Sequence, residues 1–150
     1  MSLVALVSNR FFLALDCLLV RFTGYSLVSH VYGRAVGTGY LSSLLLTTTG
    51  ARSGRRRRAV LPYYRDGERL VIVGSNGGSR RDPMWVGNLR AEPRARVHLA
   101  RRSMEVTAHV AEGEERTRLW ESITRGRGPY AAYQKRAHPR IIPVVVLALR

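Results

Sequence analysis

The apolar residues of this chain recur with a period of two, or run without interruption, over most of the segment after residue 40, which is typical of β-strands. We expect strands at residues 41–49, 60–64, 69–73, 94–100, 103–110 and 141–149. The Asp66-Gly67 pair falls between the second and third of these and is a strong signal for a two-residue hairpin turn. The pattern predicts a mainly β, α+β fold: a small barrel of about six strands with peripheral helices.

Short helices are expected between and beyond these strands. They are predicted over residues 84–90, 112–123 and 130–134. Asp82 followed by Pro83 is a good helix start, with Asp82 as N-cap and Pro83 at the first helical position. Pro93 ends this helix, and residues 75–79, SNGGS, are expected to form a glycine-rich loop before it.

Residues 1–32 have the pattern of an amphipathic helix, which a flexible joint at 33–39 connects to a second unit, the barrel domain of residues 33–150. One narrow face is polar, with Ser2, Asn9, Asp16 and Thr23. The opposite face is apolar, with Val4, Val7, Phe11, Leu15, Leu18 and Phe22.

The charges within this helix decide what kind of segment it is. Arg10 and Asp16 interrupt it well short of the roughly 20 clean residues of a membrane span. No basic segment precedes it, so it does not have the form of a signal peptide. Two interpretations stay open: packing on the body of the protein or on a second subunit, and contact of residues 1–30 with a membrane interface.

The composition favours anionic partners. Lys and Arg number 25 against 10 Asp and Glu, a formal charge of +15. Such a balance suits nucleic acid, an acidic membrane surface, or a small phosphorylated or carboxylated ligand. Cys17 is the single cysteine, which excludes an internal disulfide and indicates a reducing compartment. We therefore expect a cytoplasmic protein, with peripheral contact to the inner face of the membrane as an extension of that expectation.

The side chains themselves offer no obvious reactive group. The four histidines have no metal-ligand spacing, so we expect no metal site. Neither a G-x-S-x-G elbow nor a phosphate-binding glycine motif stands in its proper context. If the protein is an enzyme, a cofactor must supply the chemistry. Nucleic-acid binding is disfavoured, because the aromatic residues are not interleaved with the arginines.

Residues 44–64, LLLTTTGARSGRRRRAVLPYY, carry the strongest candidate site. Five arginines crowd into and just after a loop between Gly50 and Gly54, with no acid among them. Glycine lets backbone N–H groups turn toward a ligand, and arginine offers a forked donor for phosphate or carboxylate. The stretch is either an anion-binding hairpin or a solvated basic turn.

From this stretch onward the sequence resembles the deazaflavin-dependent nitroreductase and F420H2-dependent quinone reductase family. The resemblance rests on five segments in order: TTTGARSG at 47–54, SNGG at 75–78, PMWVGN at 83–88, PYAAYQ at 129–134 and IPVVVL at 142–147. Each alone is weak, whereas the ordered set over about residues 41–150 is specific. The resemblance implies a split β-barrel related to FMN-binding reductases, with coenzyme F420 as cofactor.

The resemblance also implies the residues of the site. The phosphate loop would be Ala51, Arg52 and Ser53, followed by Arg57 and Arg58. The deazaflavin ring would be bordered by Ala59, Val60, Leu61, Pro62, Gly74, Ser75, Asn76, Met84, Trp85, Val86, Gly87 and Asn88. Trp85, Tyr130 and Tyr133 would form the substrate pocket, with Tyr130 also contacting the ring.

The implied activity is hydride transfer from F420H2 to a small apolar acceptor, a quinone in preference to a nitroaromatic compound. Three departures from the family pattern make nitroreduction less certain: Ala51 replaces a basic residue, Arg55–Arg57 replace a loop proline, and Val86-Gly87 replaces an aromatic-Leu pair. The alternatives are a carrier of F420 or FMN without turnover and a nucleic-acid-binding module. A homodimer is compatible with either enzyme or carrier.

Overall fold

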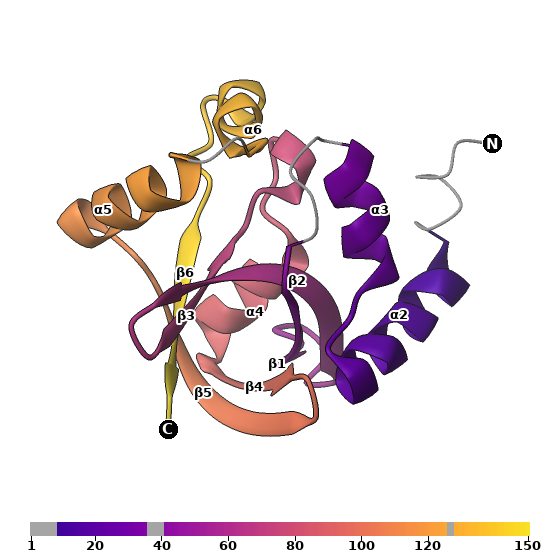
Figure 1. Cartoon of the computed structure of the whole chain (residues 1–150). Coiled ribbons are helices and arrows are strands. Elements are labelled where there is room, and N and C mark those ends of the chain that lie inside the picture. Colours follow the sequence, from indigo (N-terminus) through magenta and orange to yellow (C-terminus); the bar gives the residue numbers. More distant parts are fainter. Residues whose placement is uncertain (1–8, 36–40, 126–127) are drawn as a thin grey trace.

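The computed structural model describes residues 9–35, 41–125 and 128–150. Six antiparallel strands close into a barrel in the order β1-β2-β3-β6-β5-β4, with β1 paired to β4 (Figure 1). They are β1 (Ser43–Thr49), β2 (Arg56–Asp66), β3 (Arg69–Val73), β4 (Arg94–Leu99), β5 (Arg102–Val110) and β6 (Val144–Leu149). The predicted mainly β barrel of six strands is confirmed, including the Asp66–Arg69 pair that closes the β2–β3 hairpin.

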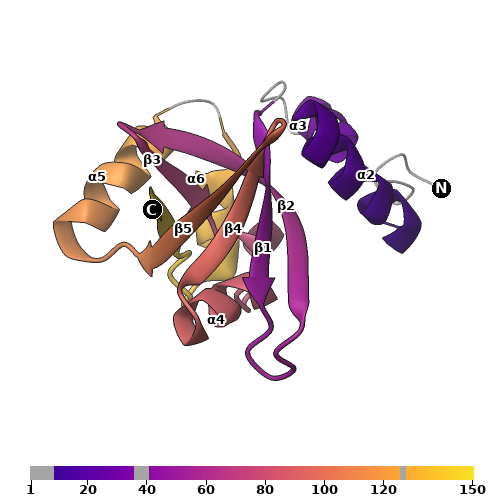
Figure 2. The same cartoon turned by 90° about the horizontal axis from the view of Figure 1, so that it is seen from below.

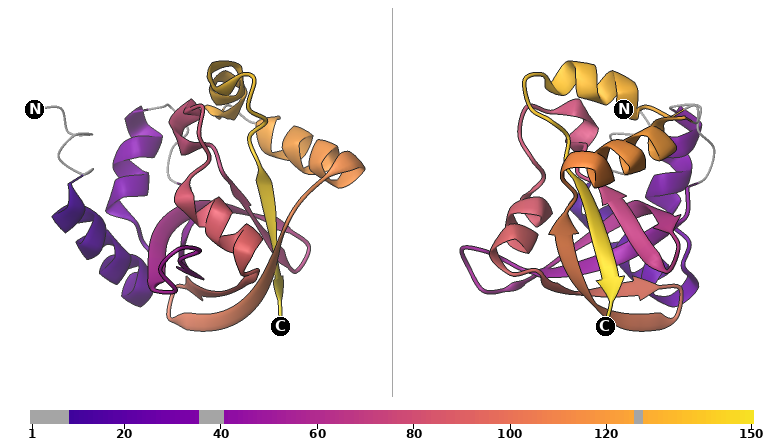
Figure 3. Two further views of the ribbon diagram at one scale, coloured as in Figure 1. Left: turned by 180° about the vertical axis from the view of Figure 1, so that it is seen from behind. Right: turned by 90° about the vertical axis from the view of Figure 1, so that its left-hand side faces the viewer.

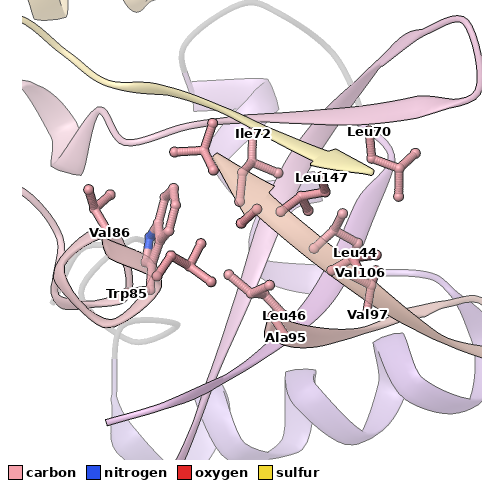
Figure 4. Packing of buried hydrophobic residues seen from close by; sticks show 13 residues of the cluster. Leu44, Leu46, Leu70, Ile72, Trp85, Val86, Ala95, Val97, Val106 and Leu147 are labelled. Carbon is pink, nitrogen blue, oxygen red and sulfur yellow. The ribbon is translucent and has the colours of Figure 1, made fainter. Parts of the chain in front are cut away.

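Alternation along the strands fills the barrel. Leu44 and Leu46 of β1, Leu70 and Ile72 of β3, and Leu147 of β6 point inward and are almost completely buried. One end of this core is completed by the helix α4 (Met84–Ala91). Figure 4 shows its Trp85 and Val86 beside the inward-pointing side chains of the strands.

Two further helices cover one end of the barrel. They are α5 (Gly113–Thr124) and α6 (Tyr130–Ala137), which lie together near the start of β6 (Figure 3). Tyr130 and Tyr133 of α6 pack with Val144 and Val146 in a second apolar cluster. The short helix η1 (Asn76–Gly78) sits against α6, where a Cβ at Gly78 would lie 3.1 Å from the Cα atom of Tyr133.

The prediction of one continuous helix over residues 1–32 is wrong. The described part forms α2 (Arg10–Thr23) and α3 (Leu27–Ala35), and the chain breaks between them at Gly24, whose φ is 74°. Asp16 is the physical reason: its buried carboxylate accepts hydrogen bonds from Ser26 Oγ and from the N–H groups of Leu27 and Val28, which starts the second helix in a new direction. Residues 1–8, and 36–40 of the expected joint, lie outside the described residues.

The apolar face of α2 is turned away from the barrel. Phe11 is 72% exposed and Phe22 is 60% exposed, and Leu15 and Leu18 lie exposed between them. The helix packs on the barrel instead through its other side, where Val20 is buried. Among the described residues, no single helix has the length and apolarity of a membrane span, and Phe11–Thr23 and Leu27–Ala35 reach them only as a pair bent by 104°.

The predicted cap of α4 also differs. Pro83, not Asp82, is the N-cap residue, and the helix begins at Met84. The carboxylate of Asp82 accepts instead from Arg90 Nη1 and Arg140 Nη1, each at 2.8 Å. Two charge-assisted hydrogen bonds outweigh one to a backbone N–H, which explains why the cap is not made.

Candidate functional site

Two adjoining cavities lie along β2, and they share Asn76, Pro83 and Trp85. The larger, which we call the arginine groove, has a volume of about 1140 Å³ and is lined in part by Arg56, Arg57, Arg58, Arg81, Met84 and Asn88. The smaller, which we call the apolar pocket, has a volume of about 500 Å³ and is lined mainly by Val28, Val60, Leu61, Pro62, Tyr130 and Tyr133. Trp85 therefore lies where the arginine groove meets the apolar pocket.

The loop between β1 and β2 is tightly closed and protrudes beyond the end of the barrel (Figure 2). The N–H groups of Gly50 and Gly54 donate to the carbonyls of Arg55 and Gly50, each at 2.8 Å. A Cβ at Gly50 would lie 2.7 Å from Ser53 Oγ and 3.1 Å from the carbonyl oxygen of Arg55, so a larger residue there would displace the Ser53 side chain. This loop fixes the start of β2, where Arg56, Arg57 and Arg58 follow.

Asn88 of α4 holds this loop against the barrel. Its Oδ1 accepts from the N–H of Ala51 at 3.0 Å, and its Nδ2 donates to Thr48 Oγ1 at 3.0 Å. The amide is 7% exposed, and both of its ends are used within the protein. Asn88 therefore shapes the wall of the groove through the loop.

The arginine groove carries positive charge that the described part of the protein does not neutralise. Arg56, Arg57, Arg58 and Arg81 make no ion pair with another described residue. The nearby carboxylate of Asp82 is already paired with Arg90 and Arg140. Several guanidinium groups along one groove without carboxylate partners fit a ligand that carries several negative charges.

The loop between β3 and α4 borders both cavities and is held from behind by Arg140. The guanidinium donates to the carbonyls of Gly74, Ser75 and Ser79 at 3.1, 2.8 and 2.9 Å, as well as to Asp82. Gly74 is needed for close packing, since a Cβ there would lie 2.7 Å from Pro143 Cγ. The side chain of Arg140 is only 12% exposed, so this contact is a fixed part of the site.

Tyr130 and Tyr133 line the apolar pocket, and Tyr64 packs against the cluster that contains them. The rings of Tyr64 and Tyr130 lie 6.2 Å apart and those of Tyr130 and Tyr133 lie 6.3 Å apart, both edge to face. Burial raises the pKa of Tyr64, and a hydrogen bond with Tyr130 partly opposes this rise. The phenol of Tyr64 thus stays protonated near neutral pH.

Comparison with known proteins assigns the chain to a family. The sequence profile of the F420H(2)-dependent quinone reductases matches residues 25–148. The chain belongs to this family.

Individual relatives agree with that assignment. The F420H(2)-dependent quinone reductase Rv1261c of Mycobacterium tuberculosis is 40% identical over 111 residues, covering 72% of this chain and 74% of the relative. A solved F420-H2 dependent reductase, FDR-A, is 35% identical with a TM-score of 0.63 and covers 70% of this chain and 92% of that one. Another solved structure with the same identity and TM-score, described as a domain-swapped dimer, covers 70% of this chain and 78% of that one.

Many of the residues that the family resemblance implies lie on the two cavities. The arginine groove takes Arg57, Arg58, Ala59, Met84 and Asn88, the apolar pocket takes Val60, Leu61, Pro62, Ser75, Tyr130 and Tyr133, and both take Asn76 and Trp85. The residues that line neither are Ala51, Arg52, Ser53, Gly74, Val86 and Gly87. Of these, the first three are exposed on the loop, Gly74 and Val86 are buried, and Gly87 is exposed on α4.

Sequence reasoning missed the contributions of the N-terminal helices. Leu13 of α2 lines the arginine groove, and Val28, Ser29 and Gly33 of α3 line the apolar pocket. It also missed Arg140, whose hydrogen-bond partner Ser75 lies 65 residues earlier in the sequence. No local pattern marks these residues, because the fold alone brings them to the site.

Proposed function

We propose that this protein is an oxidoreductase that binds reduced coenzyme F420 and reduces a quinone. The observation that carries the proposal is the pair of adjoining cavities, one lined by arginines and the other mainly apolar, in a chain of the F420H(2)-dependent quinone reductase family. When bound, the coenzyme supplies a hydride. The protein holds donor and acceptor at a fixed distance and excludes water between them.

The lining residues divide into three tasks. Arg57 and Arg58, with their neighbours on the groove, would bind the anionic part of the coenzyme by charge-assisted hydrogen bonds. Val60–Pro62 and the Ser75–Asn76 segment would hold the ring beside Trp85, which is 8% exposed and thus rigidly packed. Tyr130 and Tyr133 would close the acceptor side of the apolar pocket.

A quinone suits this pocket better than a nitroaromatic compound. The walls are mainly apolar, and the polar groups are few: Ser29, Ser75, Asn76 and the tyrosine hydroxyls. Such a site favours a flat apolar ring with one or two carbonyl oxygens. Nitroaromatic compounds are proposed as secondary acceptors.

Steady-state kinetics test the proposal. Oxidation of F420H2, followed by the return of its absorbance, should depend on both the enzyme and menadione and should saturate in each. Tight binding of F420 without menadione-dependent oxidation would show that the protein is an F420 carrier and not an enzyme. Binding of nucleic acid that falls steeply with salt, with no response to F420, would contradict both.

We also propose that α2 meets the inner face of a membrane. Phe11, Leu15, Leu18 and Phe22 form one exposed apolar row, with Arg21 stacked 5.7 Å above the ring of Phe22. An apolar row with neighbouring cations is the arrangement that binds an anionic lipid interface. Contact of this kind would bring the enzyme to lipid-soluble quinones.

Flotation with anionic liposomes tests the membrane contact. Replacing Phe11 and Phe22 together with serine should release the protein from the vesicles, while Ile141→Ser, which changes a side chain that is 68% exposed elsewhere, should not. Equal binding of all three proteins would contradict the proposal. The alternative, a homodimer through the same row, predicts a dimer in lipid-free buffer that the double substitution dissociates.

A further inference from the structure

The N-terminal helix α3 forms part of the wall of the apolar pocket. Val28, Ser29 and Gly33 line the pocket together with Tyr130 and Tyr133 of α6. The two helices stand at the same end of the barrel, with the η1 segment between them (Figures 1 and 3). An acceptor in this pocket would therefore touch a helix that the β-barrel itself does not provide.

This wall is anchored at two points. Asp16, which is 2% exposed, accepts from the N–H groups of Leu27 and Val28 at 2.8 and 3.3 Å. The hydroxyls of Ser29 and Ser43 lie 2.6 Å apart, which ties the helix to β1. A negative charge at the first turn of a helix is also favoured by its dipole. The helix cannot easily move away from a larger neighbour.

We propose that Val28 is a specificity-determining residue that sets the size of the quinone ring system the pocket admits. The inference rests on the proposed function. A β-branched side chain in a helix has one strongly preferred rotamer, so Val28 presents a fixed apolar surface. Atoms added there take volume from the pocket of about 500 Å³. The residues proposed to hold the coenzyme lie on β2, α4 and the loop before it, so coenzyme affinity should not depend on Val28.

Leu27 provides a matched control. It precedes Val28 on the same helix, is 48% exposed and lines neither cavity. Leu27→Phe therefore adds similar bulk to α3 without entering the pocket. Thermal unfolding of each variant shows whether the helix stays folded.

The test compares Val28→Phe, Val28→Ala and Leu27→Phe in two measurements. The first is kcat/KM for benzoquinone and for the two-ring menadione. Val28→Phe should lower kcat/KM for menadione by about tenfold relative to benzoquinone, through KM, and Val28→Ala should shift the ratio the other way. The second is menadione binding to the coenzyme-free protein by quenching of Trp85 fluorescence, with Trp120→Phe introduced in every variant to remove the other tryptophan; this binding should weaken only in Val28→Phe. Leu27→Phe should match the wild type in both.

Three outcomes would overturn the inference. These are an equal loss for both quinones in Val28→Phe, the same loss in Leu27→Phe, and a weakened affinity of Val28→Phe for F420. If the wild-type protein oxidised F420H2 with neither benzoquinone nor menadione as acceptor, the proposed function would be overturned instead. In that case the quenching measurement would still test the role of Val28 as a wall of the pocket.

Discussion

Asn88 shows how one side chain can shape a binding site without offering a free group to the ligand. Its amide is buried, and it joins α4 to both β1 and the loop that follows it. The loop in turn sets the positions of Arg56, Arg57 and Arg58 at the start of β2. Loss of the amide should therefore affect stability and ligand affinity together.

Replacing Asn88 with alanine should lower the free energy of unfolding by about 1–3 kcal/mol, because the N–H of Ala51 and the hydroxyl of Thr48 each lose a partner. Asn88→Asp, which keeps an acceptor for Ala51, should lose less. Urea titrations measure both values. Equal destabilisation by the two variants would show that the bond to Ala51 does not hold the loop.

The groove arginines should act mainly on the ligand. Arg57→Ala should weaken F420 affinity by about tenfold or more while changing stability little, since an exposed unpaired charge contributes little to folding. Arg52→Ala should have a smaller effect, because Arg52 lines neither cavity. Arg102→Ala, on the exposed start of β5, is the control. Parallel losses of affinity and thermal stability in Arg57→Ala would argue against its role as an anion ligand.

At the scale of elements, the loop between β3 and α4 depends on a residue near the other end of the chain. Arg140 binds three carbonyls of this loop as well as Asp82. A lysine keeps the charge but lacks the planar fork that spans these acceptors. The loop carries Ser75 and Asn76, which line the cavities and are proposed to contact the ring of the coenzyme.

Arg140→Lys should therefore lower the melting temperature and weaken F420 binding. Arg136→Lys is the matched control, because Arg136 is exposed and donates one bond, to the carbonyl of Gly77 at 3.2 Å. Differential scanning fluorimetry and F420 titration measure the two effects. A loop that tolerates Arg140→Lys as well as Arg136→Lys would contradict this account of its support.

The strands could be predicted from sequence because their period of two depends on neighbouring residues alone. The break at Gly24 could not, because it follows from the hydrogen bonds of Asp16 to Ser26, Leu27 and Val28, which lie 10 to 12 residues further along the chain. The misassigned cap at Asp82 has the same origin, since Arg140 lies 58 residues away. Local rules failed where a tertiary contact was stronger.

At the scale of the whole molecule, an ion-pair network joins the β2–β3 turn to α5 and β5. Hydrogen bonds from Arg118 and Arg69 hold the pKa of Asp66 well below its usual range. The pKa of Glu115 is also lowered, first by His109 and then by Arg69, against the effect of burial. Carboxyls with depressed pKa values stabilise the fold above their unfolded pKa of about 4 and lose that contribution as pH falls through the folded value.

The free energy of unfolding should thus fall as pH is lowered from about 5 to 2, and Asp66→Asn should make this dependence shallower. Glu68→Gln, an exposed carboxylate in the same turn, is the control. Urea unfolding across this range measures the slopes. An unchanged slope in Asp66→Asn would contradict the contribution of the network.

The candidate site, like the fold, could be predicted from sequence only in part. The ordered segments at 47–54, 75–78, 83–88 and 129–134 led to the groove, because residues close in sequence build its two main walls. Leu13 and Val28 joined it only through the docking of α2 and α3, whereas the helical pattern of residues 1–32 leaves open packing on the body of the protein, on a second subunit or on a membrane. Physical proximity in the fold, not sequence pattern, assigned them.

The central claim is that F420 binds with its anionic part in the arginine groove and its ring beside Trp85, and equilibrium titration tests it most directly. Oxidised F420 and, separately, FMN should be added to the protein at moderate salt while ligand fluorescence is followed. Charge alone does not separate the two, since both carry phosphate, but the family predicts tight F420 binding with little response to FMN. Binding of FMN alone, or of neither ligand, would contradict the account.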